Sequence, residues 1–306
     1  MSTYVVETFD LCKTYKHTMV VDHLNMKIKQ GEIYGFIGRN GAGKSTTLKM
    51  LCGLVTPSEG SFRLFQEDEV LAYQNRRIGA LVEQVGLYPN LNAQDHMELK
   101  ATGIGLHDPS KIQEILTLVH LDQAKKKPIK TFSLGMKQRL GIALALLGNP
   151  DLLILDEPIN GLDPEGIREL RDIIQSLNKE KGMTIIISSH ILEELSKIAT
   201  CYGMIKDGVL IEQLSREELE SKCRSHITLI LDDLTKACAL IEQKLLVKDY
   251  EVHDQAIWIY DDITTEAVMN VFMKEGIKIS QIYKEKQSLE SYFLHQIGGD
   301  DHAEYH

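Results

Sequence analysis

One short segment constrains the fold of this chain more than any other. Residues 38–45 read GRNGAGKS, which is the full pattern G-x-x-x-x-G-K-[ST]. The segment follows the apolar run IYGFI at 33–37 and leads directly into STTLKMLCGL, which has a helical pattern. A glycine-rich loop between a buried strand and a helix is the context that this pattern requires. The sequence therefore predicts a phosphate-binding loop in an α/β domain with a mostly parallel core sheet.

The residue types in this loop suit a nucleoside triphosphate. Glycines let backbone N–H groups turn inward around phosphates, and the amino end of the following helix adds partial positive charge. Lys44 is predicted to neutralise the β- and γ-phosphates, and Ser45 to offer its hydroxyl to Mg²⁺. The cofactors are thus expected to be ATP and Mg²⁺. The predicted nucleotide-binding residues are Gly38, Arg39, Asn40, Gly41, Ala42, Gly43, Lys44, Ser45 and Thr46.

Two later apolar runs, at 152–155 and 184–187, are continuous rather than alternating, as expected for strands covered on both faces. The first run ends in Asp156 and Glu157, and two acids there are costly unless they bind something. We expect Asp156 to support Mg²⁺ and Glu157 to face the γ-phosphate and orient the attacking water. The alternative is a strand end with two solvated acids.

The run at 184–187 is followed by Ser188, Ser189 and His190. This puts an imidazole at the carboxyl end of a strand, the edge where open α/β sheets bind ligands. A lone histidine is more often structural. Its position relative to the two preceding motifs favours a catalytic role for His190.

The sequence pattern changes near residue 215. Before it, continuous apolar runs are followed by helical patterns; after it, the segments have alternating apolar and polar residues or the pattern of amphipathic helices. We expect a nucleotide-binding domain over 1–215, with a helical subdomain inserted over about 89–148, and a small α+β accessory domain over 216–306. The polar tail, 298–306, is predicted to fray.

Composition excludes several classes of protein. With 34 basic and 44 acidic side chains the net charge is -10, so broad attraction to nucleic acid or anionic lipid is not expected. The longest apolar stretch, 140–147, is far shorter than the roughly 18 to 20 residues of a membrane-spanning helix, and the amino terminus does not read as a signal peptide. We expect a cytoplasmic chain without direct membrane insertion. The five cysteines lack C-x-x-C spacing, so no metal besides Mg²⁺ is predicted.

The order of the motifs resembles a known family. The phosphate-binding loop, FSLGMKQRL at 132–140, LLILDEPINGLD at 152–163 and then His190 are similar in content and spacing to the ABC ATPases, over about residues 3–215. The FSLGMKQRL segment is the most specific part, because other phosphate-loop enzymes lack it. The resemblance implies a P-loop NTPase fold and a homodimer with ATP held between the two copies.

The resemblance also implies individual roles. Ser133 and Gly135 stand in the signature loop, which binds the γ-phosphate of the ATP held by the opposite subunit. Asp163 matches the aspartate that communicates across the dimer, and His190 the switch histidine at the γ-phosphate. Tyr15 matches the aromatic residue that stacks on adenine, with a tyrosine packed in an amino-terminal hairpin as the alternative.

The sequence departs from the family pattern at two places. The signature reads SLGM rather than SGGQ, with Leu134 and Met136 as the replacements. The position of the glutamine that senses Mg²⁺ and the transmembrane subunit corresponds to Glu83, or to Gln84 after a one-residue shift. A glutamate at this metal site adds negative charge beside ATP, which bears on the rate of hydrolysis rather than on nucleotide binding.

Within the family the chain looks most like the ATP-binding subunits of bacitracin resistance exporters, with lantibiotic self-immunity ATPases close behind. This rests on FSLGMKQRLGIA, on VEQVGLYPNLNAQDHM with Glu83, and on the terminal SLESYFLHQIGG. The resemblance implies an ATPase that powers a separate membrane permease at the inner face of the cell membrane. The segment after Glu83, through about Asp95, is then the expected docking surface, or else an ordinary surface loop.

Two alternatives from other classes remain. One is a soluble ABC protein of translation or DNA repair, although such proteins carry two cassettes or a long coiled-coil insertion, and neither is present here. The other is a regulatory or sensing subunit that binds ATP and hydrolyses it poorly. The acid at Glu83 is the only sequence feature that favours it.

Overall fold

The computed structural model describes residues 3–67, 77–83, 85–223, 225–253 and 255–286, together with residues 292, 293 and 296. The chain forms two compact units, Met1–Arg216 and Glu217–His306. Among the described residues no helix combines the length and the apolar character needed to cross a membrane. Gln84 and the polar tail at 298–306 lie outside the described residues.

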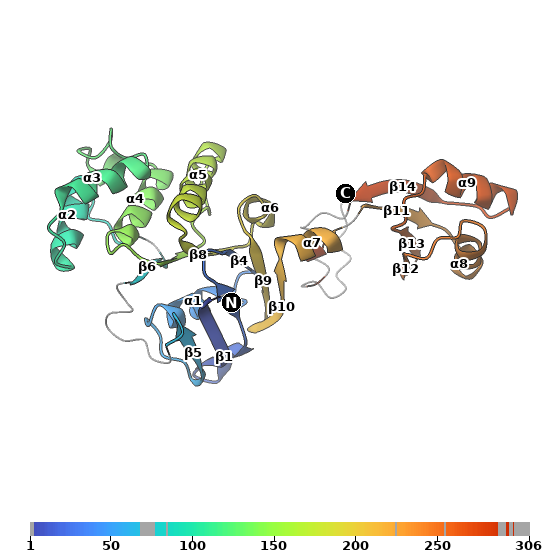
Figure 1. The fold of residues 1–306 in the computed structure, drawn as a ribbon, viewed down its shortest axis with the longest axis horizontal. Coiled ribbons are helices and arrows are strands. Elements are labelled where there is room, and N and C mark those ends of the chain that lie inside the picture. Colours follow the sequence, from blue (N-terminus) through green and yellow to red (C-terminus); the bar gives the residue numbers. More distant parts are fainter. Residues whose placement is uncertain are drawn as a thin grey trace. The chain divides into compact units, whose positions relative to one another are not determined.

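A six-stranded sheet forms the centre of the first unit, and its order confirms the predicted mostly parallel α/β core (Figure 1). Neighbouring strands are parallel, except that the edge strand at 209–215 pairs antiparallel with its neighbour at 201–206. In spatial order the strands are β10 (Val209–Ser215), β9 (Cys201–Lys206), β4 (Ile33–Ile37), β8 (Thr184–Ser189), β7 (Leu152–Asp156) and β6 (Ile78–Leu81).

The apolar runs locate three of these strands well. β4 covers the predicted run 33–37, and all five of its residues are buried. β7 is longer than its predicted run by Asp156, and β8 is longer by Ser188 and Ser189. These polar residues stay in the ladder because Asp156 pairs with Ser188, and Ser189 pairs with Ile37.

A second, antiparallel sheet packs at the amino end of the same unit. Its strands are β1 (Tyr4–Tyr15), β2 (Thr18–Leu24), β3 (Lys27–Lys29) and β5 (Glu59–Leu64), and β1 pairs with the other three. Apolar side chains of this sheet, of helix α1 (Lys44–Leu51) and of β4 form one buried core, which includes Val6, Leu24, Leu48 and Phe36. This core fixes α1 directly behind the loop that follows β4.

Three helices lie between β6 and β7 in the chain and are grouped beyond the β6 edge of the sheet (Figure 1). They are α2 (Ala93–Gly103), α3 (Pro109–Leu118) and α4 (Leu134–Leu146), with a short 3-10 turn at Ile129–Thr131. Helix α4 packs closely on the sheet, since a Cβ atom at Gly141 would lie 2.9 Å from Leu81. Two further helices, α5 (Pro164–Lys181) and α6 (Leu192–Ser196), flank β8 in sequence.

The second unit is an α+β domain, as predicted. It contains all but the first residue of α7 (Arg216–Lys222), together with β11 (Ser225–Ile230), α8 (Leu234–Gln243), β12 (Tyr250–His253), β13 (Ala256–Ile259), α9 (Thr265–Lys274) and β14 (Gln281–Lys286). The strand order is β12-β13-β11-β14, with antiparallel neighbours, so β11 to β14 form a split βαβ arrangement. One face of this sheet and helices α8 and α9 enclose a core that includes Leu229, Ile257 and Phe272.

Candidate functional site

The loop between β4 and α1 requires glycine at positions that include Gly38 and Gly43. A Cβ atom at Gly38 would lie 2.6 Å from the carbonyl oxygen of Ile205. Gly43 has φ of 105°, and a Cβ atom there would lie 2.6 Å from the carbonyl oxygen of Val20. Gly43 is also the N-cap of α1, and no side chain caps this helix, so the first backbone N–H groups face the loop without a side-chain acceptor.

Lys44 connects the loop to the end of β7. Its side chain is buried, and its Nζ donates hydrogen bonds to the carbonyl oxygens of Gly38, at 2.7 Å, and Arg39, at 3.3 Å. The same Nζ lies 3.3 Å from Oε1 of Glu157. The predicted phosphate-binding lysine and the predicted water-orienting glutamate are therefore in contact.

The carboxyl ends of β7 and β8 bring three predicted residues together through one that was not predicted. Ser188 Oγ accepts a hydrogen bond from the backbone N–H of Glu157, at 2.8 Å, and donates one to Oδ1 of Asp156, at 2.5 Å. His190 Nδ1 lies 2.8 Å from Oε2 of Glu157. Glu157 itself has φ of 47°, a left-handed conformation that is costly for a residue with a side chain. Ser188 thus contacts both acids. In the sequence, the only indication of this role was its position at the polar end of β8.

These residues fit a nucleotide with its metal ion. The uncapped amino end of α1 and the Lys44 ammonium supply positive charge for phosphates, and Ser45 and Asp156 are oxygen ligands of the kind that Mg²⁺ prefers. Oε1 of Glu157 is buried and accepts no hydrogen bond, although the Lys44 ammonium lies 3.3 Å away as an ion pair. Strained backbone and an unsatisfied buried acceptor are features of functional sites.

The residues predicted to act across the dimer form a separate cluster at two helix amino ends. Ser133 caps α4, accepting from the N–H of Met136 at 3.2 Å, and Asp163 caps α5, accepting from the N–H of Gly166 at 3.0 Å. The two helix ends are adjacent, since a Cβ atom at Gly135 would lie 3.9 Å from the Cα of Gly166. Within the described residues, no side-chain hydrogen bond or ion pair joins this cluster to the one around Lys44.

Tyr15 and Glu83 lie at the surface. Tyr15 ends β1, is 45% exposed, and has the Lys13 ammonium 5.0 Å from its ring centre. Glu83 follows β6, has φ of 71°, and forms an ion pair with Lys49 of α1. Lys49 was not among the predicted site residues, because nothing in the spacing of residues indicates a contact between α1 and the segment after β6.

The segment 85–95 is held in place by one histidine of α2. His96 is buried, its Nε2 accepts a hydrogen bond from the N–H of Tyr88 at 2.8 Å, and its Nδ1 lies 2.8 Å from the carbonyl oxygen of Asn92. The Tyr88 side chain is exposed. A pocket of about 310 Å³ lies beside this segment and includes Val85, Leu87 and Leu134 in its lining.

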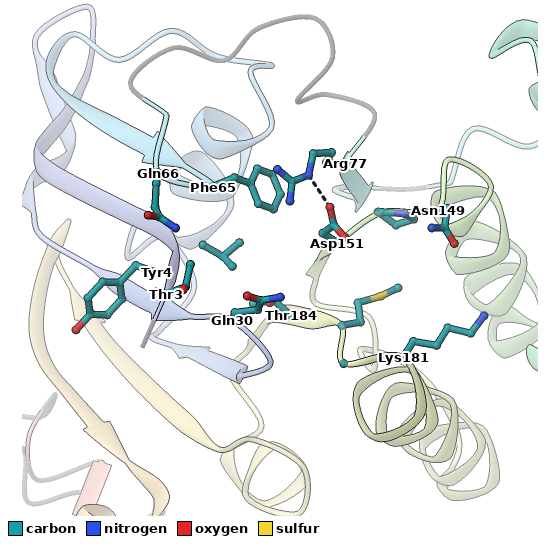
Figure 2. A pocket seen from close by; sticks show the side chains of 14 residues that line it. Thr3, Tyr4, Gln30, Phe65, Gln66, Arg77, Asn149, Asp151, Lys181 and Thr184 are labelled. Atoms are coloured by element: carbon teal, nitrogen blue, oxygen red, sulfur yellow. Dashed lines mark hydrogen bonds and ion pairs between the residues drawn. The ribbon is translucent and has the colours of Figure 1, made fainter. Parts of the chain in front are cut away.

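Figure 2 shows a larger pocket, of about 370 Å³, with the side chains that line it. Its lining includes Gln30, Asp151 and Thr184, which stand at or just before the amino ends of β4, β7 and β8, whereas the phosphate-binding loop follows the carboxyl end of β4. Arg77 spans part of it, with Nε 2.5 Å from Oδ2 of Asp151 and its guanidinium 3.7 Å from the Phe65 ring centre. No residue of the predicted site lines this pocket.

One further group of side chains has metal-ligand character. Cys12, Asp22 and His23 bring one ligand atom each to within 4.8 Å of one another. Asp22 Oδ1 and His23 Nδ1 are 2.5 Å apart and bind each other, and the Cys12 thiol donates to the carbonyl oxygen of Asp10. These polar atoms are satisfied within the hairpin.

Comparison with known proteins identifies the family. Residues 21–160 match the family model described as ABC transporter. The bacitracin transport ATP-binding protein BcrA of Bacillus licheniformis is 46% identical over 98% of this chain and 99% of its own length. The lantibiotic transport ATP-binding protein SrtF of Streptococcus pyogenes is 48% identical over 66% of this chain and 87% of its own length.

A solved structure agrees with this match. The dimeric post-hydrolysis state of an ATP-binding cassette bound to ADP and Pi superposes with a TM-score of 0.62 and 25% identity, over 69% of this chain and 98% of that one. The fold, the phosphate-binding loop and the near full-length relatives agree, and the chain belongs to the ATP-binding proteins of the ABC transporter family.

Proposed function

We propose that this chain is the ATP-binding and ATP-hydrolysing subunit of an exporter that protects a bacterium from peptide antibiotics of the bacitracin kind. The contact of Glu157 with both Lys44 and His190 is the single observation that carries the hydrolytic part. The bacitracin relative supports the choice of substrate, because the match extends over both units of the chain.

The hydrolytic chemistry follows from the groups around Glu157. The N–H groups of residues 38–46 and the Lys44 ammonium hold the phosphate chain. Ser45 and Asp156 would hold Mg²⁺, which would neutralise charge on the phosphate oxygens. A Glu157 oxygen takes a proton from water as the water oxygen attacks the γ-phosphorus, and the bond to the bridging oxygen breaks to give ADP and phosphate. His190 fixes the Glu157 carboxylate, and we expect it to contact the γ-phosphate once ATP is bound.

The second cluster is proposed to act on the nucleotide of another copy. Ser133 and Gly135 lie at the amino end of α4, whose partial positive charge and N–H groups suit a γ-phosphate. Asp163 lies beside them at the start of α5. Two copies arranged head to tail complete two sites, and the exposed ring of Tyr15 stacks on adenine.

The membrane partner is proposed to dock on the segment 85–95 next to Glu83. This segment is ordered by His96, presents the exposed Tyr88 ring and borders the pocket that includes Leu87. An aromatic residue beside an apolar pocket is the composition found at the centres of protein interfaces. The chain then works at the cytoplasmic face of the membrane, attached through a separate permease.

Two other candidate functions differ in their support. A lantibiotic self-immunity ATPase is the nearer one, but that relative matches 66% of the chain against 98% for the bacitracin protein. A regulatory subunit with weak hydrolysis draws support from Glu83, whose charge is paired with Lys49.

The direct test is the release of phosphate by the purified chain at saturating ATP and Mg²⁺. The Glu157→Gln variant is expected to lose at least about a hundredfold in rate while still binding ATP. The control is Glu165→Gln, a solvent-exposed acid in the first turn of α5, which should stay within about twofold of the parent. Equal rates for Glu157→Gln and parent contradict the assignment, and a parent that binds ATP without turnover favours the regulatory subunit.

A further inference from the structure

An ion pair between Lys49 and Glu83 joins helix α1 to the segment that follows β6. Lys49 lies in the last turn of α1, and Glu83 follows β6, so 34 residues separate them in the chain. The Lys49 Nζ donates to Oε1 of Glu83. The lysine side chain is 25% exposed and the glutamate side chain 66% exposed, so the ammonium is the more enclosed member of the pair.

Lys49 stands on the side of α1 that carries the expected metal ligand. Residues four apart share one face of a helix, which puts Lys49 one turn beyond Ser45. The hydrogen bond to Glu83 is the largest of the influences that raise the pKa of Lys49, and the charges of Tyr15 and Asp156 act in the same direction. Lys49 therefore places a positive charge against Glu83, on the helix that begins at the proposed phosphate site.

We propose that Lys49 is a positioning residue that neutralises Glu83, so that a carboxylate can stand next to the nucleotide without repelling its phosphates. This inference rests on the proposed ATP site. A neutral glutamine at position 83 would need no compensating charge, but this chain has a glutamate there. The left-handed backbone of Glu83 sets the direction in which its side chain leaves the main chain. The compensating charge then has to come from a neighbouring element, and Lys49 supplies it.

If the ion pair acted only on stability, removing Lys49 would lower the unfolding midpoint and leave nucleotide affinity unchanged. Exposed ion pairs contribute little to the free energy of unfolding. Removing Lys49 should thus leave the unfolding midpoint nearly unchanged and should act on nucleotide affinity instead. The effect should also depend on Glu83, because without that charge there is nothing to compensate.

The test is a double-mutant cycle on the full chain, measured as ATP binding in buffer with EDTA, where no turnover occurs. Lys49→Met is expected to weaken ATP binding about tenfold in the parent and less than about twofold in a Glu83→Gln background. Lys49→Arg should bind like the parent. Glu83→Gln alone should bind ATP within about twofold of the parent, since Lys49 already neutralises the carboxylate that this change removes.

A matched control removes the same charge elsewhere. Lys111→Met breaks an ion pair with Glu114 on α3, and the Lys111 side chain is 23% exposed, close to the value for Lys49. This variant should bind ATP within about twofold of the parent. The proposal is overturned if Lys49→Met weakens binding equally in both backgrounds, or if Glu83→Gln alone weakens binding by more than about twofold. A parent chain that fails to bind ATP with Mg²⁺ present contradicts the proposed function itself.

Discussion

The imidazole Nδ1 of His190 lies 2.8 Å from Oε2 of Glu157, at the carboxyl ends of two neighbouring parallel strands, β8 and β7. The other carboxylate oxygen of Glu157 lies 3.3 Å from the Lys44 ammonium. One glutamate therefore contacts both the residue proposed to bind phosphate and the residue proposed to respond to it. The first predictions concern these contacts.

Replacing His190 by alanine is expected to lower the rate of ATP hydrolysis by about a hundredfold or more, because the Glu157 carboxylate loses the group that fixes its orientation. ATP affinity should change by less than about threefold, since Lys44 and the loop remain intact. Phosphate release and equilibrium ATP binding measure the two effects. The control is alanine at His107, an exposed histidine before α3, and equal rates for the two variants would contradict the role of His190.

Replacing Ser188 by alanine is expected to destabilise the fold by about 1 to 3 kcal/mol, since the partly buried N–H of Glu157 and the Asp156 carboxylate both lose a partner. ATP hydrolysis should fall as well, because both acids are released. Urea unfolding and phosphate release test this. Alanine at the adjacent buried Ser189, whose Oγ hydrogen-bonds to the backbone of Ile191 and to no other group in the described part of the chain, should keep the activity. The role of Ser188 fails if both variants hydrolyse ATP alike.

The Ser133→Asp variant separates the capping of α4 from the proposed binding of phosphate. Aspartate is as good an N-cap as serine, so Ser133→Asp should keep the unfolding midpoint within a few degrees. The added negative charge should repel a γ-phosphate and abolish the ATP-induced dimer of the Glu157→Gln variant. Light scattering with and without ATP measures the dimer. A Ser133→Asp chain that still dimerises with ATP would limit Ser133 to its capping role.

Burial raises the pKa of the Cys201 thiol from 9.0 to about 12. The folded state keeps the proton while the unfolded state loses it above pH 9, so this contribution to stability is complete below pH 9 and is lost as the pH rises toward 12. Between pH 8 and pH 10 the parent should lose about 1.3 kcal/mol more of its free energy of unfolding than Cys201→Ala does. Parallel losses in urea titrations at the two pH values would show that the thiol does not contribute.

The sequence predicts the central strands because they are buried on both faces. The run 33–37 gives β4 directly, and the acids at the end of β7 mark the ligand-binding edge. The apolar-run criterion does not detect Ser188 and Ser189, since their strand pairing depends on the neighbouring β7 and β4. The sheet of β1 with β5 is likewise hidden, because its pairing joins residues such as Val6 and Leu64 that lie far apart in the chain.

The candidate site shows the same limit. Lys44 and Glu157 are identified by local motifs, and the structure puts them in contact. Lys49 carries no local signal, since its relation to Glu83 exists only once α1 and β6 are packed in one unit. The roles of Tyr15, Ser133 and Asp163 stay predictions, because they involve a nucleotide and a second copy of the chain.

The most direct test of the central claim is the bacitracin tolerance of a sensitive bacterium that expresses this chain with its permease. We predict that tolerance rises with the parent chain, is absent with Glu157→Gln and is retained with Glu165→Gln at equal expression. Exposure of the same strains to a lantibiotic separates the two substrate classes. Tolerance that is unchanged by the parent, or equal for the parent and Glu157→Gln, would contradict an ATP-driven exporter of bacitracin.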